Sequence, residues 1–430
     1  MKISSLDAYQ IYDSRGNPTI EVQLRLSNGV TGNGLVPSGA STGQFEAHEL
    51  RDGDVENFRG KSVNQAVEHV QGEIARALVG RDVLDQADLD QRMIALDGTT
   101  NKGRLGANAI LGVSLAAASA AAACQGVPLF ESLGCGKGSL LPLPEVQIIG
   151  GGAHANWRTD IQDFMVIATG AQTYSEALKM TFDVYHAAGD LLREQGKYCG
   201  LADEGGYWPE FETNEKVLDF MLEAIESAGY SPGEEVCLSL DIAASDLYNA
   251  ATQTYDLRLE GRRCDSSEFV DLMIEWCHRY PIVSLEDPAA DVDWDSWQRI
   301  YESLGKKVQI VGDDLFTTAV ERIRQGMERR AANSVLIKVN QIGTVTETID
   351  AIRMTQEAGW LPVVSARSGE TEDAFISHLA VATNAGQLKV GAFARSERMA
   401  KWNECLRIER ALGSQARFEG AQIYQRIFTD

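Results

Sequence analysis

The 430-residue sequence has little positive charge for its size. It holds 39 Lys and Arg against 62 Asp and Glu, so the formal net charge is −23. Negative charge in such excess repels nucleic-acid phosphates and anionic lipid surfaces over the chain as a whole. We therefore expect no nucleic-acid partner and no role at a membrane surface.

Long apolar runs and paired cysteines are also missing. Residues 1–16 contain no apolar stretch long enough for a signal peptide, and we expect no later segment to have the length and apolarity of a membrane span. The seven cysteines are scattered without a CxxC pair, which suits a reducing compartment better than a disulfide framework. The expected location is the cytoplasm.

Phosphate-binding glycine motifs are absent as well. No GxGxxG or GxxxxGK[ST] motif follows an apolar run, which removes the usual support for a dinucleotide or nucleoside triphosphate site. What the chain does have is 44% hydrophobic and 23% charged residues, the balance of a globular protein with a large core.

The N-terminal third predicts a small sheet followed by helices. Residues 3–12 and 19–26 have the pattern of strands, with Asn28-Gly29 as a turn. A helix is expected from Ser62 to Gly80, where Ser62 and Gln65 have the spacing of a capping box, and another over about 85–97. Residues 108–124 are small and apolar nearly all round, which predicts a helix buried between layers.

Beyond residues 140–144, short β-branched runs alternate with amphipathic segments. This alternation predicts parallel βα units, and six or more of them favour a closed barrel. The runs are 236–240, 282–285, 308–311, 335–337 and 361–364, and the predicted helices include 266–279, 345–358 and 370–385.

Polar residues follow these runs one after another. They are Asp241, Glu286, Asp313 with Asp314, Lys338, and Arg367 with Ser368. In a parallel barrel such positions share the carboxyl-terminal rim, so we expect them to converge. Acids that meet there repel one another unless a cation lies among them, and oxygen ligands suit Mg²⁺. The competing interpretation is that each acid only caps the following helix.

Lys338 stands in an apolar context after the last of these acids, and Lys389 would provide a second ammonium group. Lys338 is either a counter-ion to the carboxylates or a base whose pKa is lowered by burial and nearby positive charge. The spacing leaves both interpretations open.

Three glycine-rich segments supply further candidates. VPSGASTG at 36–43 combines hydroxyl and small residues, which suits a lid over an anion, although an ordinary turn has the same composition. GLADEGGYWP at 200–209 presents Asp203 and Glu204 before two glycines, and IIGGGAHAN at 148–156 presents His154.

Nine ordered motifs make the chain resemble the enolase family. They are DSRGNPT, VPSGASTG, NAILGVSLA, DEGG, SLEDP, GDDL, KVNQIGT, RSGETED and ARSER. The resemblance implies an α/β fold, in which an α+β N-terminal capping domain (residues 1–138) precedes a modified eight-stranded (β/α) TIM-type barrel (139–430). It also implies Mg²⁺-dependent interconversion of 2-phosphoglycerate and phosphoenolpyruvate, a small phosphorylated carboxylate substrate, and a homodimer or higher homo-oligomer.

The resemblance also implies a role for individual residues. Asp241, Glu286 and Asp313 match the metal ligands, with Ser41 as a ligand to a second metal. Lys338 matches the general base and Glu204 the general acid. The residues that match substrate-binding positions, or lie beside them, are His154, Gln162, Asp163, Arg367, Ser368 and Lys389.

Several positions depart from the family pattern. Ala366 stands where the pattern SHRSGETED has histidine, and Asp163 stands where QEFM has glutamate. The other departures are Gln147, Gly150, Trp157 and Phe393. Two further hypotheses therefore stay open. One is an enolase-like paralogue of specialised metabolism, such as a carboxyphosphonoenolpyruvate synthase of phosphinate biosynthesis, and the other is a non-catalytic binding protein.

Overall fold

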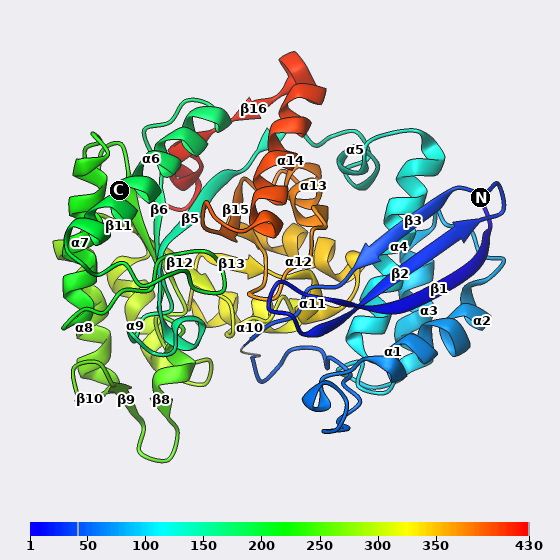
Figure 1. The fold of residues 1–430 in the computed structure, drawn as a ribbon, viewed down its shortest axis with the longest axis horizontal. Helices are drawn as coiled ribbons and strands as arrows, with labels where there is room; N and C mark the ends of the chain where they lie inside the picture. The colour runs from blue at the N-terminus through cyan, green and yellow to red at the C-terminus, as the bar shows by residue number, and fades with distance from the viewer. Residues whose placement is uncertain (41–42, 429–430) are drawn as a thin grey trace.

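The computed structural model describes residues 1–40 and 43–428. The chain opens with an antiparallel sheet of three strands in the order β1 (Ile3–Tyr12), β2 (Pro18–Leu26) and β3 (Thr31–Leu35), drawn in blue in Figure 1. The alternation predicted for β2 is confirmed, because Ile20, Val22, Leu24 and Leu26 are all buried.

Helices cover one side of this sheet. A continuous helical stretch consists of α1 (Asn64–His69), the π-helical η2 (Val70–Ile74) and α2 (Ala75–Leu78), and α3 (Gln86–Asp97) follows it. The predicted capping box is wrong. Asp52 instead accepts hydrogen bonds from the backbone N–H groups of Asn64 and Gln65 at 3.0 and 2.9 Å, so a distant carboxylate satisfies the first turn.

The helix α4 (Ala107–Gln125) is buried between the sheet and the rest of the molecule, as predicted. A Cβ atom on Gly34 of β3 would come within 2.3 Å of the Gly112 carbonyl oxygen, so glycine is needed for this close approach. Contrary to expectation, α4 is long and apolar enough to cross a membrane by length and composition alone, and 83% of its apolar window is buried inside the protein.

The closed barrel predicted from the alternation is confirmed, and it has the eight strands that the family resemblance implies (Figure 1). Its strands are β5 (Leu143–Gly150), β6 (Asp163–Ile167), β7 (Cys237–Asp241), β11 (Ile282–Glu286), β12 (Gln309–Gly312), β13 (Ser334–Ile337), β14 (Leu361–Ser365) and β15 (Gln387–Gly391). The helices that accompany them are α6 (Tyr174–Glu194), α7 (Asn214–Ser227), α8 (Ser266–Arg279), α9 (Trp294–Leu304), α10 (Val320–Arg329), α11 (Val339–Ile342), α12 (Val345–Glu357), α13 (Phe375–Ala382) and α14 (Ser396–Leu412).

The barrel is not wholly parallel, which corrects the simple βα prediction. Strand β6 runs antiparallel to both β5 and β7. No α-helix lies between β5 and β6, only the short turn η3 (Gly152–Ala155), and a short connection joins antiparallel neighbours. The predicted helix 370–385 is also shorter than expected, since α13 begins at Phe375.

Smaller elements complete the chain. The helix α5 (Leu129–Leu133) leads to β4 (Leu140–Leu141), which pairs with β16 (Arg417–Phe418). A separate three-stranded sheet consists of β8 (Tyr248–Asn249), β9 (Thr254–Leu257) and β10 (Arg262–Asp265). The remaining 3₁₀ turns are η1 (Phe58–Gly60), η4 (Ala244–Leu247), η5 (Gly413–Gln415) and η6 (Gly420–Arg426).

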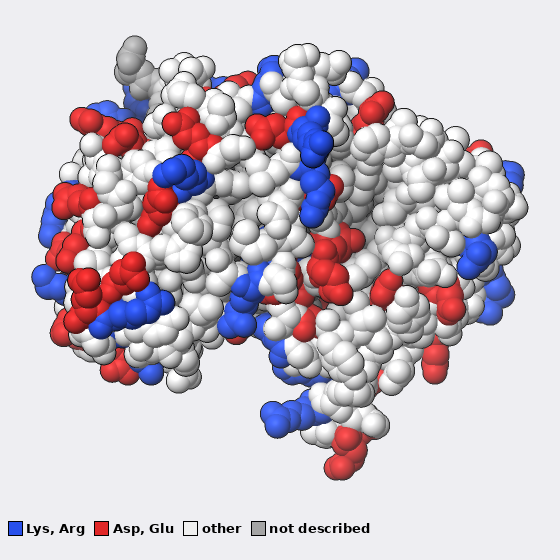
Figure 2. Space-filling model, turned by 45° about the horizontal axis from the view of Figure 1, so that its top comes forward, with Lys and Arg blue, Asp and Glu red and all other residues white. Residues whose placement is uncertain are grey.

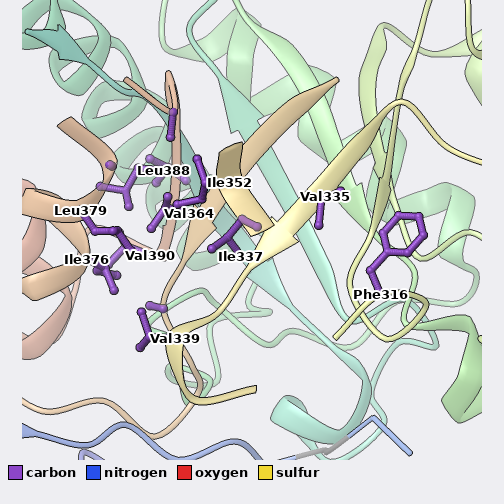
Figure 3. Close-up of a cluster of buried hydrophobic side chains, with 14 of the residues drawn as sticks. Phe316, Val335, Ile337, Val339, Ile352, Val364, Ile376, Leu379, Leu388 and Val390 are labelled. Carbon is purple, nitrogen blue, oxygen red and sulfur yellow. The ribbon is translucent and has the colours of Figure 1, made fainter. Parts of the chain in front are cut away.

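Alternate residues of the strands face opposite sides of the barrel wall. Val335 and Ile337 of β13 belong to the main apolar cluster with Ile352 of α12, as Figure 3 shows. Leu336, between them in sequence, belongs instead to a small inner cluster with Val311 and Val363. Because side chains alternate along a strand with a period of two residues, every second side chain of a barrel strand points toward the interior.

Candidate active site

The structure brings the predicted polar residues together at one rim of the barrel. Asp241 and Glu286 are the last residues of β7 and β11, which pair in register. Asp313 directly follows β12, and Lys338 directly follows β13. Lys389 comes from β15. Residues far apart in sequence therefore share one site, as the strand-end pattern predicts.

Lys389 is the centre of one half of this site. Its Nζ atom lies 2.8 Å from Asp241 Oδ2, 2.8 Å from Glu286 Oε2 and 3.4 Å from Asp163 Oδ2, and all four side chains are buried. Burial lowers the pKa of Lys389, but the charges of Asp241 and Glu286 outweigh it and raise that pKa well above the ordinary value.

The single ammonium group of Lys389 lies close to three carboxylates. Burial and then the charge of Asp241 raise the pKa of Glu286 well above its ordinary value. Oε1 of Glu286 is buried and has no hydrogen-bond partner among residues 1–40 and 43–428. A buried carboxylate oxygen of this kind is expected to meet a ligand.

Lys338 forms the second ion pair of the rim. Its ammonium group donates to Asp313 Oδ2, and Gln341 Nε2 donates to Asp313 Oδ1 at 2.7 Å. Burial opposes the charged form, but the charge of Asp313 raises the pKa of Lys338 above its ordinary value. This contact fits the first of the two interpretations of Lys338, a counter-ion to the carboxylates.

Asp287 belongs to the site but was not predicted from sequence. Its two carboxylate oxygens accept hydrogen bonds from the backbone N–H groups of Asp313 and Asp314, at 2.9 and 2.8 Å. Carboxylate atoms of these three residues lie within 4.8 Å of one another. The only hint in the sequence was the pair of adjacent acids Glu286 and Asp287 in SLEDP. In the structure, Asp287 holds the loop that carries Asp313.

Glu204 lies beside Asp163 and His154 in the same buried cluster. Its Oε1 is 3.9 Å from Nδ1 of His154, and both side chains are buried. Burial and then the charge of Glu204 raise the pKa of Asp163 to about 6. Gln147 donates to the other oxygen of Asp163. This side of the site therefore holds two nearby carboxyl groups in a desolvated environment.

Gln162 connects this side to the metal-ligand candidates. Its Nε2 donates to Asp241 Oδ2 at 2.9 Å. Gln162 Oε1 and His154 Nδ1 are buried without a hydrogen-bond partner in the part of the chain that the structure describes. Both atoms are therefore candidates to form a hydrogen bond with a ligand.

Arg367 and Ser368 follow β14 and lie on the side of the site nearest the glycine-rich lid segment. Arg367 binds the carboxylate of Glu46 and donates to Oδ1 of Asn340 at 2.9 Å. Ser368 Oγ is buried and lacks a hydrogen-bond partner among the described residues. A cavity of about 420 Å³ is lined in part by Glu46 and Asn340, the two residues that contact Arg367, but not by Arg367 or Ser368.

The lid segment is hydrogen-bonded to the loop that follows Arg367 and Ser368. Ser38 and Gly369 exchange backbone hydrogen bonds of 2.8 and 2.9 Å, and Gly43 N–H donates to Glu46 Oε1 at 3.0 Å. Ser41, the predicted ligand to a second metal, lies outside the described residues. Glu46 was not predicted, since nothing in its local sequence separates it from an ordinary surface acid.

The donor set of the rim fits a divalent cation with hard oxygen ligands. Asp241, Glu286 and Asp313 offer only carboxylate oxygens, and the two lysine ammonium groups sit on these oxygens as stand-in positive charges. Such an oxygen-only set suits Mg²⁺ better than a softer metal.

Comparison with known proteins gives matches over nearly the whole chain. A family model described as "Enolase, N-terminal domain" matches residues 3–133, and one described as "Enolase, C-terminal TIM barrel domain" matches residues 138–427. A relative named Enolase 1, from Desulfitobacterium hafniense (strain Y51), is 54% identical over 424 residues, which cover 98% of this chain and 97% of the relative.

Proposed function

This chain belongs to the enolase family of lyases, and on that premise we propose that it dehydrates 2-phospho-D-glycerate to phosphoenolpyruvate with Mg²⁺ as cofactor. The observation that carries the proposal is the convergence of Asp241, Glu286 and Asp313 with Lys338 and Lys389 at one barrel rim.

Lys338 is the proposed base. It would take the proton from the carbon next to the substrate carboxylate, which requires its ion pair with Asp313 to open and its ammonium group to lose a proton first. Lys389, which contacts Asp241 and Glu286, would place a second positive charge near the resulting negative charge. Asp241, Glu286 and Asp313 would hold Mg²⁺, with Ser41 as a ligand to a second ion, and the metal would supply positive charge that stabilises the substrate carboxylate as the electron pair of the broken C–H bond delocalises onto it.

Glu204 is the proposed acid. Hydroxide is a poor leaving group, so a proton from Glu204 would let it depart as water. The geometry that supports this role is the buried position of Glu204 beside His154 and Asp163. His154, Gln162 and Asp163 would line the end of the site that holds the leaving hydroxyl.

Arg367 and Ser368 are the proposed phosphate contacts. The planar guanidinium group binds phosphate oxygens with two parallel hydrogen bonds, and the buried hydroxyl of Ser368 offers a third donor. The substrate would thus be held by its phosphate at one end and by its carboxylate at the metal ligands.

The direct test is to mix the pure protein with Mg²⁺ and 2-phosphoglycerate and to follow the ultraviolet absorbance of the enolpyruvate product. We expect turnover that is abolished in Lys338→Ala and retained in Lys307→Ala, which changes a lysine outside the site. Turnover that Lys338→Ala leaves undiminished would contradict the assignment.

A second candidate function is supported by Ala366. This residue is buried beside Arg367, where the family pattern has histidine, and its N–H donates to the carbonyl oxygen of Lys389 at 2.9 Å. A smaller side chain there suits an enolase-like paralogue with a larger ligand, such as a carboxyphosphonoenolpyruvate synthase.

Ala366→His distinguishes the two functions. One hydrogen bond to a charged group contributes about 1.5 to 3 kcal/mol, so the histidine should speed 2-phosphoglycerate dehydration roughly tenfold to a hundredfold if the protein is a specialised paralogue. A parent enzyme that is already fast, and that gains nothing from histidine, would favour the glycolytic function.

We further infer that the protein works in the cytoplasm as a homodimer or higher homo-oligomer, and that its two domains meet at residue 138. The family resemblance supports the oligomer, and the seven free cysteines suit a reducing compartment. Sedimentation analysis of the purified protein would measure the oligomeric state.

A further inference from the structure

The segment that follows β15, residues 392–398, contacts both the loop of the proposed acid and the loop of the proposed phosphate contacts. We propose that two arginines of this segment are positioning residues: Arg398 fixes Arg367 and Ser368, and Arg395 fixes the loop that carries Glu204. The inference rests on the proposed function, because it concerns how the phosphate and acid ends of that site are held apart.

Arg398 lies in the first turn of α14 and is fully buried. Its Nη1 donates to the carbonyl oxygens of Arg367 at 2.6 Å and Val390 at 3.0 Å, and its Nη2 donates to the carbonyl oxygen of Ser368 at 2.6 Å. The guanidinium group therefore bridges the end of β15 and both phosphate-contact residues.

A buried charge is costly, and only a rigid fork of donors reaches three carbonyl groups on two different segments. A lysine ammonium would be a point charge that reaches fewer of them. The identity of Arg398 therefore has a geometric reason beyond charge.

Lys401 of α14 supports the same loop through Glu370, a residue of the loop itself. Lys401 Nζ lies 2.8 Å from Glu370 Oε2 and donates to the carbonyl oxygen of Thr371 at 2.6 Å. Glu370 Oε1 in turn accepts the backbone N–H of Arg367 at 3.0 Å. The backbone of Arg367 is thus held through both its N–H and its carbonyl group.

Arg395 acts on the other side of the segment. Its Nη2 donates to the carbonyl oxygens of Ala202 at 3.0 Å and Leu201 at 3.3 Å, just before Glu204. Its backbone has a φ of +67°, a conformation that non-glycine residues adopt rarely, so the surrounding contacts must hold it there. Ala392 N–H also donates to the Glu204 carbonyl oxygen at 2.9 Å.

The two arginines are three residues apart, so this short segment sets the spacing between the acid loop and the phosphate loop. A change in that spacing of a fraction of an ångström would misalign the leaving hydroxyl with Glu204 while the phosphate stays bound. Each arginine should therefore affect a different kinetic quantity.

Arg398→Lys and Arg398→Gln test the phosphate side. We expect KM for 2-phosphoglycerate to rise about tenfold while kcat changes by less than about threefold, and we expect the rise in melting temperature that inorganic phosphate gives the wild type to be lost. A folded variant with wild-type KM and phosphate response would overturn the assignment. Failure of both variants to fold would overturn it too, in favour of a purely structural role.

Arg395→Gln tests the acid side, and its exposed side chain makes loss of folding a minor concern. We expect kcat to fall about tenfold with KM unchanged, while exchange of the C2 hydrogen with solvent, which needs only the base, continues. Equal losses of exchange and product formation would contradict the role. Arg407→Lys, on the exposed face of α14, is the matched control and should behave as wild type.

These results separate the inference from the proposed function. If the wild type turns over no 2-phosphoglycerate, the proposed function fails, and the phosphate titration alone then decides the role of Arg398. If the wild type is active but the variants keep its KM, kcat and phosphate response, only the positioning role fails.

Discussion

The carboxylate of Glu46 pairs with the guanidinium group of Arg367, with 3.1 Å between Nη1 and Oε2 and 3.2 Å between Nη2 and Oε1. Both side chains are buried, at 7% and 4% exposed. Glu46 thus presents to Arg367 the same planar pair of oxygens that a phosphate group would present. A phosphorylated ligand must therefore displace Glu46 or share the arginine with it.

Glu46→Gln should tighten the binding of inorganic phosphate by about tenfold. The neutral amide competes less well for Arg367, and a charge-assisted hydrogen bond is worth roughly one to two kcal/mol more than a neutral one. Isothermal titration with phosphate measures the change, with the exposed acid change Glu56→Gln as the control. Weaker binding in Glu46→Gln would mean that Glu46 helps to organise the site instead of competing for it.

Saturating Mg²⁺ should stabilise the protein. Acids that repel one another in the absence of a ligand bind the ion only in the folded state, and a ligand at about a hundred times its Kd contributes about 2.7 kcal/mol. The melting temperature should rise with Mg²⁺, and Asp313→Asn should remove most of the rise. Asp271→Asn, which changes an exposed acid on α8, should not. A melting temperature that does not change on addition of Mg²⁺ would contradict the metal assignment.

Glu145 is expected to give the stability of the folded protein a further pH dependence. It lies inside the barrel on β5, where Gln387 Nε2 donates to it at 3.2 Å and Ser239 Oγ at 3.3 Å, and burial raises its pKa to about 7. A carboxyl group with a raised pKa contributes stability that is complete below its ordinary pKa and is lost as the pH rises through about 7.

Glu145→Gln should remove this loss. The wild type should lose about 3 kcal/mol of unfolding free energy from this group between pH 4.5 and pH 8, and the glutamine variant should be more stable than the wild type at pH 8. Denaturant titrations at both pH values, with the exposed change Glu226→Gln as the control, measure it. A variant with the same pH dependence as the wild type would show that Glu145 titrates normally.

Periodicity predicts most of the fold, and it fails where a contact distant in sequence decides the outcome. The alternation in β2 and the apolar surface of α4 are local, and both are confirmed. The direction of β6 depends on how the chain turns after Gly150, which apolar spacing does not encode. The capping of α1 comes from Asp52, so the Ser62 and Gln65 spacing was misleading.

The candidate site divides in the same way. Acids at strand ends could be found because strand ends meet at one rim. Asp287, Glu46 and Arg398 were missed because each acts through backbone groups or partners far along the chain. The overall charge is also a poor guide to local function, since acidic and basic side chains are intermixed on the face shown in Figure 2.

The central claim is the division of labour between Lys338 as base and Glu204 as acid. It is tested most directly by exchange of the C2 hydrogen of 2-phosphoglycerate with deuterium oxide in the presence of Mg²⁺, followed by nuclear magnetic resonance. We predict that Glu204→Gln still exchanges this hydrogen while forming little phosphoenolpyruvate, and that Lys338→Ala does neither. Exchange that survives in Lys338→Ala would contradict the account.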